Sequence, residues 1–355
     1  MEVKEFSFTN GDYSFSLLNL GCALTSLCGP DKDGKISNVL LHYHNAVKDP
    51  STILNTDACF GLTVGRFANR IGGAQFSLKG KTYSFEANNG PNLLHSGKNS
   101  LRFKIWDIRK ENDGFTCLVK SSEAEDGFPG NLDARVRFSL SADGLFRIHY
   151  SISCSEDCPI NFTNHAYFNL SGEERALKGL EKGLEKGSEK GSEKGSDGTI
   201  FDHIAQFNSS KVLAVDDALI PTGAYIPVEG TSWDFRRPKR IGQDFSAPEL
   251  APALGYDHAY VIDRLDSSSR GFTQFAKIYD PASGRTLCAY TDLPAFHFYT
   301  GNYIRGEEGY VTHGGLCLET EFYPNCVNNE AFPSCILKAG DLFESTTVYY
   351  LYAVK

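Results

Sequence analysis

The sequence predicts a large all-β protein built from antiparallel strands, and three observations support this prediction. Short stretches of alternating apolar and polar residues recur along the chain, separated by Gly, Asn, Asp or Pro. Amphipathic patterns long enough for a helix of about 12 residues are scarce. The 355 residues include 25 Phe and 17 Tyr, which favour strands, and 34 Gly, which favour turns.

The individual strands can be placed from the period of their side chains. The stretch 145–153, LFRIHYSIS, alternates regularly enough to turn one face toward a core and the other toward solvent. Five further stretches also indicate strands: 74–78, 82–85, 115–120, 134–141 and 346–354. A chain of many short strands and few helices favours an antiparallel architecture.

Residues 1–355 are expected to form a single domain, because all-β sandwiches often exceed 200 residues as one unit. One segment departs from the pattern: residues 178–198 read KGLEKGLEKGSEKGSEKGSDG. A glycine at every fourth position costs about 1 kcal/mol each relative to alanine in a helix, and the segment offers little to a core. We interpret residues 176–199, approximately, as a solvated and disordered insert that expanded by repeat duplication. A functional tether is the alternative.

Charge and hydropathy exclude several classes of partner. The chain has 35 basic and 44 acidic residues, a formal net charge of −9, whereas nucleic-acid binding needs clustered Lys and Arg. No segment approaches the roughly 18 continuous apolar residues of a membrane span. The first ten residues lack the apolar run of a signal peptide. We therefore expect a cytoplasmic protein that handles a neutral small molecule.

Cysteine and histidine spacing gives little indication of a metal. The ten cysteines are scattered through apolar segments, and only Cys154 and Cys158 lie close together. Buried free thiols are the favoured interpretation, with disulfides or a metal site as alternatives. His42 and His44 form an H-x-H pair, but no third ligand is indicated and their neighbours suggest an ordinary strand. No cofactor is expected either, because dinucleotide, Walker and G-x-S-x-G motifs are absent.

Polar residues capable of chemistry occur in five short segments. The first, GRFANRI at 65–71, places Arg66, Asn69 and Arg70 close together, where they could bind sugar hydroxyls or form a surface turn with salt bridges. The second, NLLHSG at 92–97, places His95 at the end of an apolar strand. A lone histidine at such a position is more often structural than catalytic.

The third segment, NFTNHAYFNL at 161–170, predicts a strand that lines a cleft. Side chains on a strand alternate between two faces, so one face would carry Thr163, His165, Tyr167 and Asn169. Histidine titrates near neutrality and can give or take a proton at working pH. A buried polar network without catalysis is the alternative.

The fourth segment, GYDHAY at 255–260, places Asp257 among aromatic residues. A carboxylate in such surroundings needs partners. Asp257 could bind two sugar hydroxyls, and His258 could be its structural partner.

The fifth segment, HGGLCLETEF at 313–322, contains Glu319 and Glu321 two positions apart. On a strand they share a face, roughly 7 Å apart at Cα, so each opposes the ionisation of the other and one pKa should rise. A carboxylate with a raised pKa is a better general base near pH 7. The alternative is an exposed edge with two solvated acids, which the apolar neighbours disfavour.

These five segments, in this order, resemble the aldose 1-epimerase (galactose mutarotase) family. GRFANRI matches the family's Arg-containing loop, and LLHSG is similar to its Leu-His-Gly-Gly stretch. NFTNHAYFNL, GYDHAY, FYTGN at 298–302 and CLETE match its later blocks, and residues 219–238 resemble its connecting region. The likeness covers nearly the whole chain except the insert. It implies a single-domain β-supersandwich of antiparallel sheets with an open cleft.

The resemblance also implies an activity and a set of roles. His165 would be the general acid, Glu319 the general base, and His95 a second imidazole near the ring oxygen. Asn69, Arg70 and Asp257 would bind hydroxyls, and His297 occupies a position that often contributes to the sugar site. The implied reaction interconverts the α and β anomers of a free hexose, galactose or glucose, without a cofactor or metal. The implied partner is this monosaccharide alone, and the chain would act as a monomer or homodimer.

Three positions depart from the family pattern. Ser96 stands where Gly is common, His297 where Gln is frequent, and Glu321 where Gln is again frequent. None removes a catalytic group. Together they leave the preferred hexose open, because they alter the hydrogen-bonding groups of the cleft.

Three other functions compete with this interpretation. A glycoside hydrolase could use Asp257 and Glu319 as paired carboxylates. A non-enzymatic sugar-binding module could keep the arginine and aspartate but would not need His165 and Glu319 together. A hexose-6-phosphate 1-epimerase would need a phosphate pocket, for which the candidates are Arg66, Arg236, Arg237 and Lys239.

Overall fold

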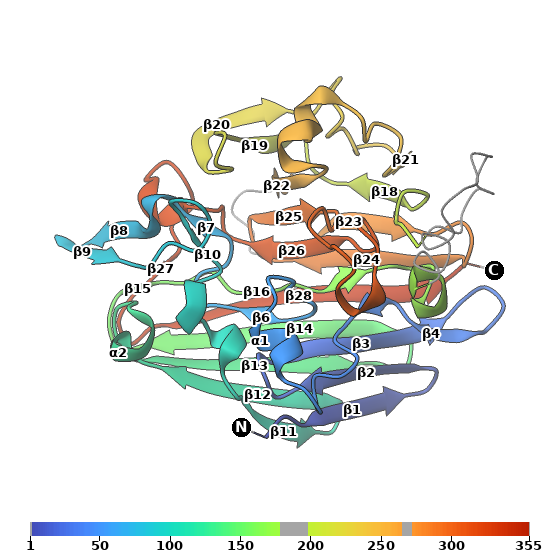
Figure 1. The fold of residues 1–355 in the computed structure, drawn as a ribbon, viewed down its shortest axis with the longest axis horizontal. Helices are drawn as coiled ribbons and strands as arrows, with labels where there is room; N and C mark the ends of the chain where they lie inside the picture. Colours follow the sequence, from blue (N-terminus) through green and yellow to red (C-terminus); the bar gives the residue numbers. More distant parts are fainter. Residues whose placement is uncertain (1, 178–197, 265–271, 355) are drawn as a thin grey trace.

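The computed structural model describes residues 2–177, 198–264 and 272–354, and it confirms the all-β antiparallel prediction (Figure 1). Strand pairs within its three larger sheets are all antiparallel. The predicted insert at about 176–199 falls almost entirely outside the described residues.

A nine-stranded sheet is the largest sheet in the described part of the chain. Its strands, in spatial order, are β11 (Asp107–Glu111), β12 (Gly114–Ser121), β13 (Leu132–Leu140), β14 (Leu145–Cys154), β28 (Leu342–Ala353), β24 (Arg285–Thr291), β23 (Thr273–Tyr279), β18 (Ile204–Phe207) and β21 (Lys239–Arg240). The long central pair β14 and β28 joins the strands from the first half of the chain to those from the second half.

The predicted strands agree with observed ones, with ends shifted by a few residues. The stretch 145–153 is β14, and its alternation is confirmed because Phe146, Ile148, Tyr150 and Ile152 are buried while the residues between them are partly or fully exposed. The stretches 115–120, 134–141 and 346–354 correspond to β12, β13 and β28. The stretches 74–78 and 82–85 form the hairpin β8 (Gln75–Leu78) and β9 (Lys81–Ser84).

Two smaller sheets complete the main framework. One contains β1 (Glu5–Asn10), β2 (Tyr13–Leu18), β3 (Ala23–Pro30) and β4 (Ile36–Asn38). The other has the order β20 (Pro221–Pro227), β19 (Lys211–Val215), β22 (Asp257–Val261), β25 (Ala295–Tyr299) and β26 (Cys317–Glu321).

Both smaller sheets pack on the same face of the nine-stranded sheet. The Phe15 ring of β2 lies 5.0 Å from the Phe146 ring of β14, and the blue strands β2 and β3 lie over the green strands β13 and β14 in Figure 1. Phe146 pairs with Tyr349 of β28, and the Tyr349 hydroxyl donates to the Leu318 carbonyl of β26 at 2.9 Å. Directly paired residues share a sheet face, so β2 and β26 cover one face, as a sandwich requires.

Short two-stranded ladders and helices connect these sheets. The ladders pair β5 (Leu40–Leu41) with β17 (Tyr167–Phe168), β6 (Thr63–Val64) with β16 (Thr163–Asn164), β7 (Arg70–Ile71) with β10 (Leu93–Leu94), and β15 (Cys158–Pro159) with β27 (Ile336–Leu337). In the described residues the helices include α1 (Ser51–Leu54), α2 (Glu123–Asp126), residues 173–177, and the 3-10 turns η1 (Gly72–Ala74), η2 (Gly97–Asn99), η3 (Leu101–Phe103), η4 (Pro248–Ala253), η5 (Glu307–Gly309) and η6 (Cys326–Asn328). None of the helices in the described ranges is long and apolar enough to cross a membrane.

The prediction of one continuous strand over 161–170 was wrong. The segment is extended but changes partner, pairing with β6 at Thr163 and with β5 at Tyr167. Between the two ladders, the His165 N–H donates to the Leu62 carbonyl at 2.9 Å. The predicted shared face holds for His165 and Tyr167, whose rings stack at 4.8 Å. Asn169 instead donates to the carbonyls of Gly198 and Gly314.

Candidate active site

The candidate site lies on the face of the five-stranded sheet that points away from the nine-stranded sheet. On β26, the Thr320 hydroxyl is hydrogen-bonded to Thr347 of β28, so Thr320 faces the core. Because strand side chains alternate, Glu319 and its neighbours two positions away face the opposite side. The register then places His297 of β25 directly beside Glu319, and pairs Asp257 of β22 with Tyr299. Every one of these side chains is held by a strand.

A cavity of about 590 Å³ lies over this face, within the usual range of small-molecule sites. It brings together all seven site residues that the sequence predicted: Asn69, Arg70, His95, His165, Asp257, His297 and Glu319. Three of them come from adjacent strands β22, β25 and β26. Of the other four, Arg70 lies in β7 with Asn69 directly before it, His95 follows β10, and His165 lies between β16 and β17.

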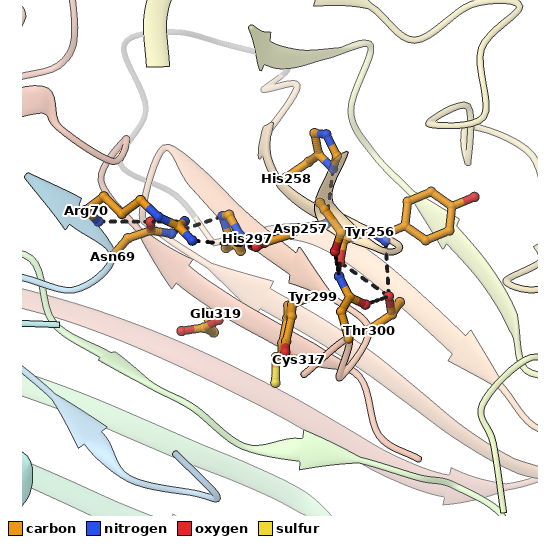
Figure 2. Close-up of polar contacts among 12 residues, drawn as sticks. Asn69, Arg70, Tyr256, Asp257, His258, His297, Tyr299, Thr300, Cys317 and Glu319 are labelled. Atoms are coloured by element: carbon orange, nitrogen blue, oxygen red, sulfur yellow. Dashed lines mark hydrogen bonds and ion pairs between the residues drawn. The ribbon is translucent and has the colours of Figure 1, made fainter. Parts of the chain in front are cut away.

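A connected polar row crosses the wall of this cavity (Figure 2). His297 Nε2 lies 2.5 Å from Asp257 Oδ1, and Asn69 Nδ2 lies 3.1 Å from His297 Nδ1. The Asn69 amide nitrogen can only donate, so Nδ1 of His297 accepts this hydrogen bond. Nε2–H of His297 then donates to Asp257. The Arg70 guanidinium lies 3.8 Å from the other Asp257 oxygen. Burial opposes ionisation of Asp257, but the His297 hydrogen bond and the Arg70 charge lower its pKa below the usual range.

The predicted pairing of Asp257 with His258 was wrong, and strand geometry explains why. Adjacent residues on β22 point to opposite faces, so His258 faces the core, with its ring 4.9 Å from that of Trp233. Its Nδ1 accepts a hydrogen bond from the Asp257 backbone N–H rather than binding the carboxylate. His297, one strand away on the same face, takes the role assigned to His258.

His165 and Glu319 face each other across the cavity, with 3.6 Å between Nε2 and Oε1. His165 Nδ1 lies 3.4 Å from the Cys317 sulfur. Burial, and then the charge of His297, lowers the pKa of His165 to about 3. Burial and the charge of Asp257 raise the pKa of Glu319 well above its ordinary value, against a smaller opposing effect of Arg70.

Both pKa shifts favour the uncharged form of the group concerned, because burial disfavours the charged forms. In that form a neutral imidazole faces a protonated carboxyl group. An imidazolium facing a carboxylate contains the same total number of protons and differs only in which atom carries one of them. The site can therefore pass between the two forms by one proton transfer without exchange with solvent.

His95 stands beside this pair in a tightly bonded loop. Its ring lies 5.4 Å from the His165 ring, and its Nδ1 accepts the Asn69 backbone N–H at 3.1 Å, which leaves the proton on Nε2. The His95 backbone N–H in turn donates to the Asn69 carbonyl at 3.0 Å. Burial and the charge of His165 lower the pKa of His95 well below its ordinary value.

Ser96 does not line the cavity, among the residues that the structure describes there. Its φ of 61° lies in the left-handed region that usually favours glycine. Its hydroxyl accepts the Phe67 backbone N–H at 2.8 Å and donates to the Phe67 carbonyl at 3.0 Å. Ser96 therefore clamps the loop that carries Asn69 and Arg70, and does not alter the hydrogen-bonding groups of the cavity directly.

Arg66, grouped with Asn69 and Arg70 in the sequence, lies elsewhere. Its side chain is fully buried and points at α2, where Nε donates to Asp126 at 2.8 Å. The other guanidinium nitrogens donate to the Pro129 and Gly130 carbonyls. Every polar end of Arg66 is occupied, so it supports the loop rather than binding a ligand. The alternative of a turn with salt bridges was right about the salt bridge and wrong about the surface, because the Arg66–Asp126 pair is buried.

Several cavity residues escaped the sequence argument. They are Arg102, Tyr299 and Tyr303, together with the segment 55–59. Tyr299 lies in the FYTGN block, which was matched to the family without a role for this tyrosine. Arg102 had no such signal. It follows a leucine in η3, and its guanidinium lies 2.9 Å from the Cys59 sulfur.

Glu321 lies directly behind the cavity wall and is fully buried. Its Oε1 accepts from Asn69 Nδ2 at 3.2 Å and lies 3.6 Å from His297 Nδ1, whereas Oε2 has no hydrogen-bond partner among the residues that the structure describes. Burial, and then the charge of Glu319, raises the pKa of Glu321 well above its ordinary value. Glu319 and Glu321 thus form the coupled pair that their spacing predicts. The pKa values of both glutamates rise, whereas their spacing predicted that the pKa of one of them would rise.

Replacing Glu321 by Gln is expected to stabilise the protein at pH 8. A raised pKa in the folded state means that the wild-type protein loses stability as pH rises above the unfolded value, about 4.3 for Glu. Gln carries no such charge, so the variant should gain about 1–3 kcal/mol at pH 8, comparable to the desolvation cost of an unsatisfied buried polar group. Urea unfolding at pH 5 and pH 8 measures this.

The matched control for this stability test is Glu344→Gln, at a glutamate whose side chain is 57% exposed. Its unfolding midpoint should follow the wild type at both pH values. A Glu321→Gln variant that is less stable than wild type at pH 8 would contradict a protonated Glu321.

All ten cysteines are free thiols, as the sequence predicted, and nine of them are buried. Cys154 and Cys158, the closest pair in sequence, are unlinked.

Comparison with known proteins decides the family. A family model described as aldose 1-epimerase matches residues 4–350. The chain belongs to the aldose 1-epimerase family. It is 33% identical to a galactose mutarotase from Sus scrofa, with 99% of this chain and 94% of that protein covered. An aldose 1-epimerase from Escherichia coli K12 is 32% identical, over 97% of this chain and 93% of its own length.

Solved structures of this family share the fold. An aldose epimerase homologue from C. elegans superimposes with a TM-score of 0.84 at 27% identity, covering 99% of this chain and 100% of its own. A galactose 1-epimerase from Lactobacillus acidophilus gives a TM-score of 0.76 at 20% identity, over the full length of both chains. The resemblance seen in the sequence is thus confirmed, together with the isomerase class and the aldose 1-epimerase activity that it implied. The rival functions are not favoured.

Proposed function

We propose that this chain interconverts the α and β anomers of free galactose or glucose, with His165 as general acid and Glu319 as general base. The observation that carries the proposal is the opposed pair itself, 3.6 Å apart and buried in a sugar-sized cavity. Catalytic hydrogen bonds are often long before substrate binds. A bound sugar would place its C1 hydroxyl within hydrogen-bond distance of Glu319 and its ring oxygen within hydrogen-bond distance of His165.

The reaction needs one proton to circulate. Glu319 removes the proton of the C1 hydroxyl while His165 protonates the ring oxygen, so that the C1–O5 bond breaks and an open-chain aldehyde forms. Rotation about C1–C2 presents the other carbonyl face. On closure the O5 hydroxyl returns its proton to His165, and the C1 oxygen takes a proton from Glu319. Atoms and charges balance, and each group ends as it began.

The reactive form is the imidazolium–carboxylate state of the pair, reached by moving the resting proton from Glu319 to His165. One fixed charge assists this transfer, because Arg70 lowers the pKa of Glu319. Asp257 raises the pKa of both His165 and Glu319. Binding the sugar hydroxyls through the Asp257–Arg70 pair places these charges beside the reacting atoms. His95, with its proton on Nε2, is proposed to donate toward the ring oxygen.

The pH profile of kcat/KM is expected to be bell-shaped. Activity requires one proton on the pair, so the rate should fall at acid pH as His165 takes a second proton near its pKa of about 3. It should fall again at alkaline pH as Glu319 loses its proton at its raised pKa. Polarimetry between pH 4 and 10 tests the alkaline limb. A rate that rises steadily with pH would show that ionised Glu319 beside neutral His165 is the active form.

Replacing Asp257 by Asn should weaken substrate binding more than it slows the chemistry. The change removes a charged hydrogen-bond acceptor, worth about 1.5–3 kcal/mol, so KM should rise by about 10–100-fold with a smaller fall in kcat. Initial rates by polarimetry over a range of sugar concentrations separate the two effects. A fall in kcat at unchanged KM would place Asp257 in the chemistry, as the hydrolase alternative requires.

Side-by-side polarimetry on freshly dissolved α-galactose, α-glucose and a hexose 6-phosphate tests the substrate. We expect acceleration with the two free hexoses and little with the phosphate. Of the phosphate-binding candidates, Arg66 is buried against Asp126 and Arg236 is paired with Asp234 and Glu229. Lys239 is paired with Asp244, and in the described part of the chain none of the four candidates lines the cavity.

Two further observations would overturn the proposal. Preferential turnover of the phosphate would replace the free-hexose substrate. Release of the aryl group from an aryl glycoside would favour the hydrolase. The single-domain organisation and the choice between monomer and homodimer stay predictions, which limited proteolysis and sedimentation would check.

A further inference from the structure

A second cluster of ligand-type side chains lies outside the cavity, at the end of β5. The sequence predicts His42 and His44 as an H-x-H pair on an ordinary strand without a third ligand. The strand ends at Leu41, so the two histidines occupy the segment that follows it. Residues 173–177, which are helical, bring Glu173 against both imidazoles. The fold thus supplies the third group that the local sequence lacks.

The three side chains converge on one point. His42 Nε2 lies 2.7 Å from Glu173 Oε1, and His44 Nδ1 lies 3.9 Å from the same oxygen. One ligand-type atom from each residue lies within 4.8 Å of the other two. Zinc bonds of about 2.0–2.2 Å in a tetrahedral site separate neighbouring ligand atoms by roughly 3.3 Å. Small side-chain movements would therefore bring all three atoms to bonding distance from one ion.

The surroundings hold both imidazoles in place. The two rings lie 4.3 Å apart in an edge-to-face arrangement. The His44 ring stacks on Tyr310 at 5.6 Å, and the His42 backbone N–H donates to the Tyr310 hydroxyl. The ligand side chains keep between 19% and 31% of their surface exposed. An ion could enter from solvent and meet groups that are already oriented.

The charge of the cluster favours a divalent cation. Glu308 accepts the His44 backbone N–H at 2.9 Å and so places a second carboxylate next to His44. Two imidazoles and a carboxylate form the donor set of many zinc sites that keep an open position.

We propose that His42, His44 and Glu173 form a binding site for one divalent transition-metal ion, with Zn²⁺ as the fitting ion. Three protein ligands leave a fourth position for water or for the Glu308 carboxylate. The bound ion would fasten the segment at 173–177 to the end of β5. This site is separate from the sugar cavity, whose described lining contains none of the three ligands.

Isothermal titration of the full-length, tag-free protein with ZnCl₂ at pH 7.5 tests the proposal. The wild type should bind one Zn²⁺ per chain at this site. His42→Ala, His44→Ala and Glu173→Gln should each weaken binding by at least about 10–100-fold, the loss that even outer-sphere partners of a metal produce. Thermal unfolding in EDTA confirms that each variant is folded.

A matched control separates this site from ordinary histidine–glutamate pairs. His149 lies 3.4 Å from Glu344 with similar exposure but without a second imidazole, so His149→Ala should leave zinc binding unchanged. His165, Cys317 and Glu319 in the sugar cavity also converge closely enough to hold an ion. Cys317→Ser should therefore leave the proposed site intact.

Absence of zinc binding by the wild type would overturn the proposal. The proposal would also be overturned if His42→Ala bound Zn²⁺ as tightly as the wild type. A loss of Zn²⁺ binding in Cys317→Ser instead would overturn it as well.

Discussion

Glu319→Gln is expected to lower kcat for mutarotation by about 10²–10⁴-fold, the usual contribution of one general acid–base group. Gln cannot accept the C1 hydroxyl proton, so ring opening loses its base. The fold should survive because burial and the nearby Asp257 charge favour the neutral form of Glu319. A neutral isostere therefore changes little in the unliganded cavity. Polarimetry on α-galactose, corrected for spontaneous mutarotation, measures the loss.

Glu321→Gln is the informative comparison for this variant. Glu321 shares the strand face with Glu319 but lies behind the cavity wall and contacts Asn69. Its replacement should reduce kcat far less than that of Glu319. If the two variants lost kcat equally, the two carboxyl groups would act together as the base. A large loss in Glu321→Gln alone would move the base to that residue.

His165→Ala is expected to produce a loss of similar size, about 10²–10⁴-fold in kcat. The imidazole delivers a proton to the ring oxygen, and no other group lies as close to Glu319 with a transferable proton among the contacts that the structure describes. Truncation also removes a ring that stacks on Tyr167. Thermal unfolding must therefore accompany the polarimetry, so that lost catalysis is separated from lost folding.

His95→Ala provides the matched control for this assignment. The two imidazoles are neighbours, but His95 bonds the Asn69 backbone through Nδ1, whereas His165 faces Glu319. Loss of His95 should therefore impair the rate less than loss of His165. Near-normal mutarotation by a folded His165→Ala variant, with a severe loss in His95→Ala, would transfer the acid role to His95.

The raised pKa of Glu319 illustrates what a linear pattern can indicate. Glu319 and Glu321 are two apart in a strand-like stretch, so their shared face and mutual repulsion follow from local geometry alone. The size of the shift depends on burial, and burial depends on β28 and the core beneath β26. The spacing indicated the interaction, whereas the fold decided that both pKa values rise.

Long-range partners were the part that could not be predicted. Asp257 was assigned to its neighbour His258, yet strand alternation turns His258 away and places His297, 40 residues later, beside the carboxylate. Arg66 and Arg70 lie four residues apart, but one is buried against Asp126 and the other reaches Asp257. Which segments become neighbours depends on strand register, and register is set by core packing across the whole sandwich.

The sequence alone determined the all-β class, the alternation of β14, the free thiols and the ordered motifs that place seven residues in one cavity. These features depend on side-chain period, composition and order, which are local properties of a chain. Only the tertiary structure decided the His297–Asp257 pair, the structural role of Arg66, and the approach of Glu173 to His42. Those contacts join segments 40 to 131 residues apart, and no local pattern specifies which distant side chain a folded chain brings into reach.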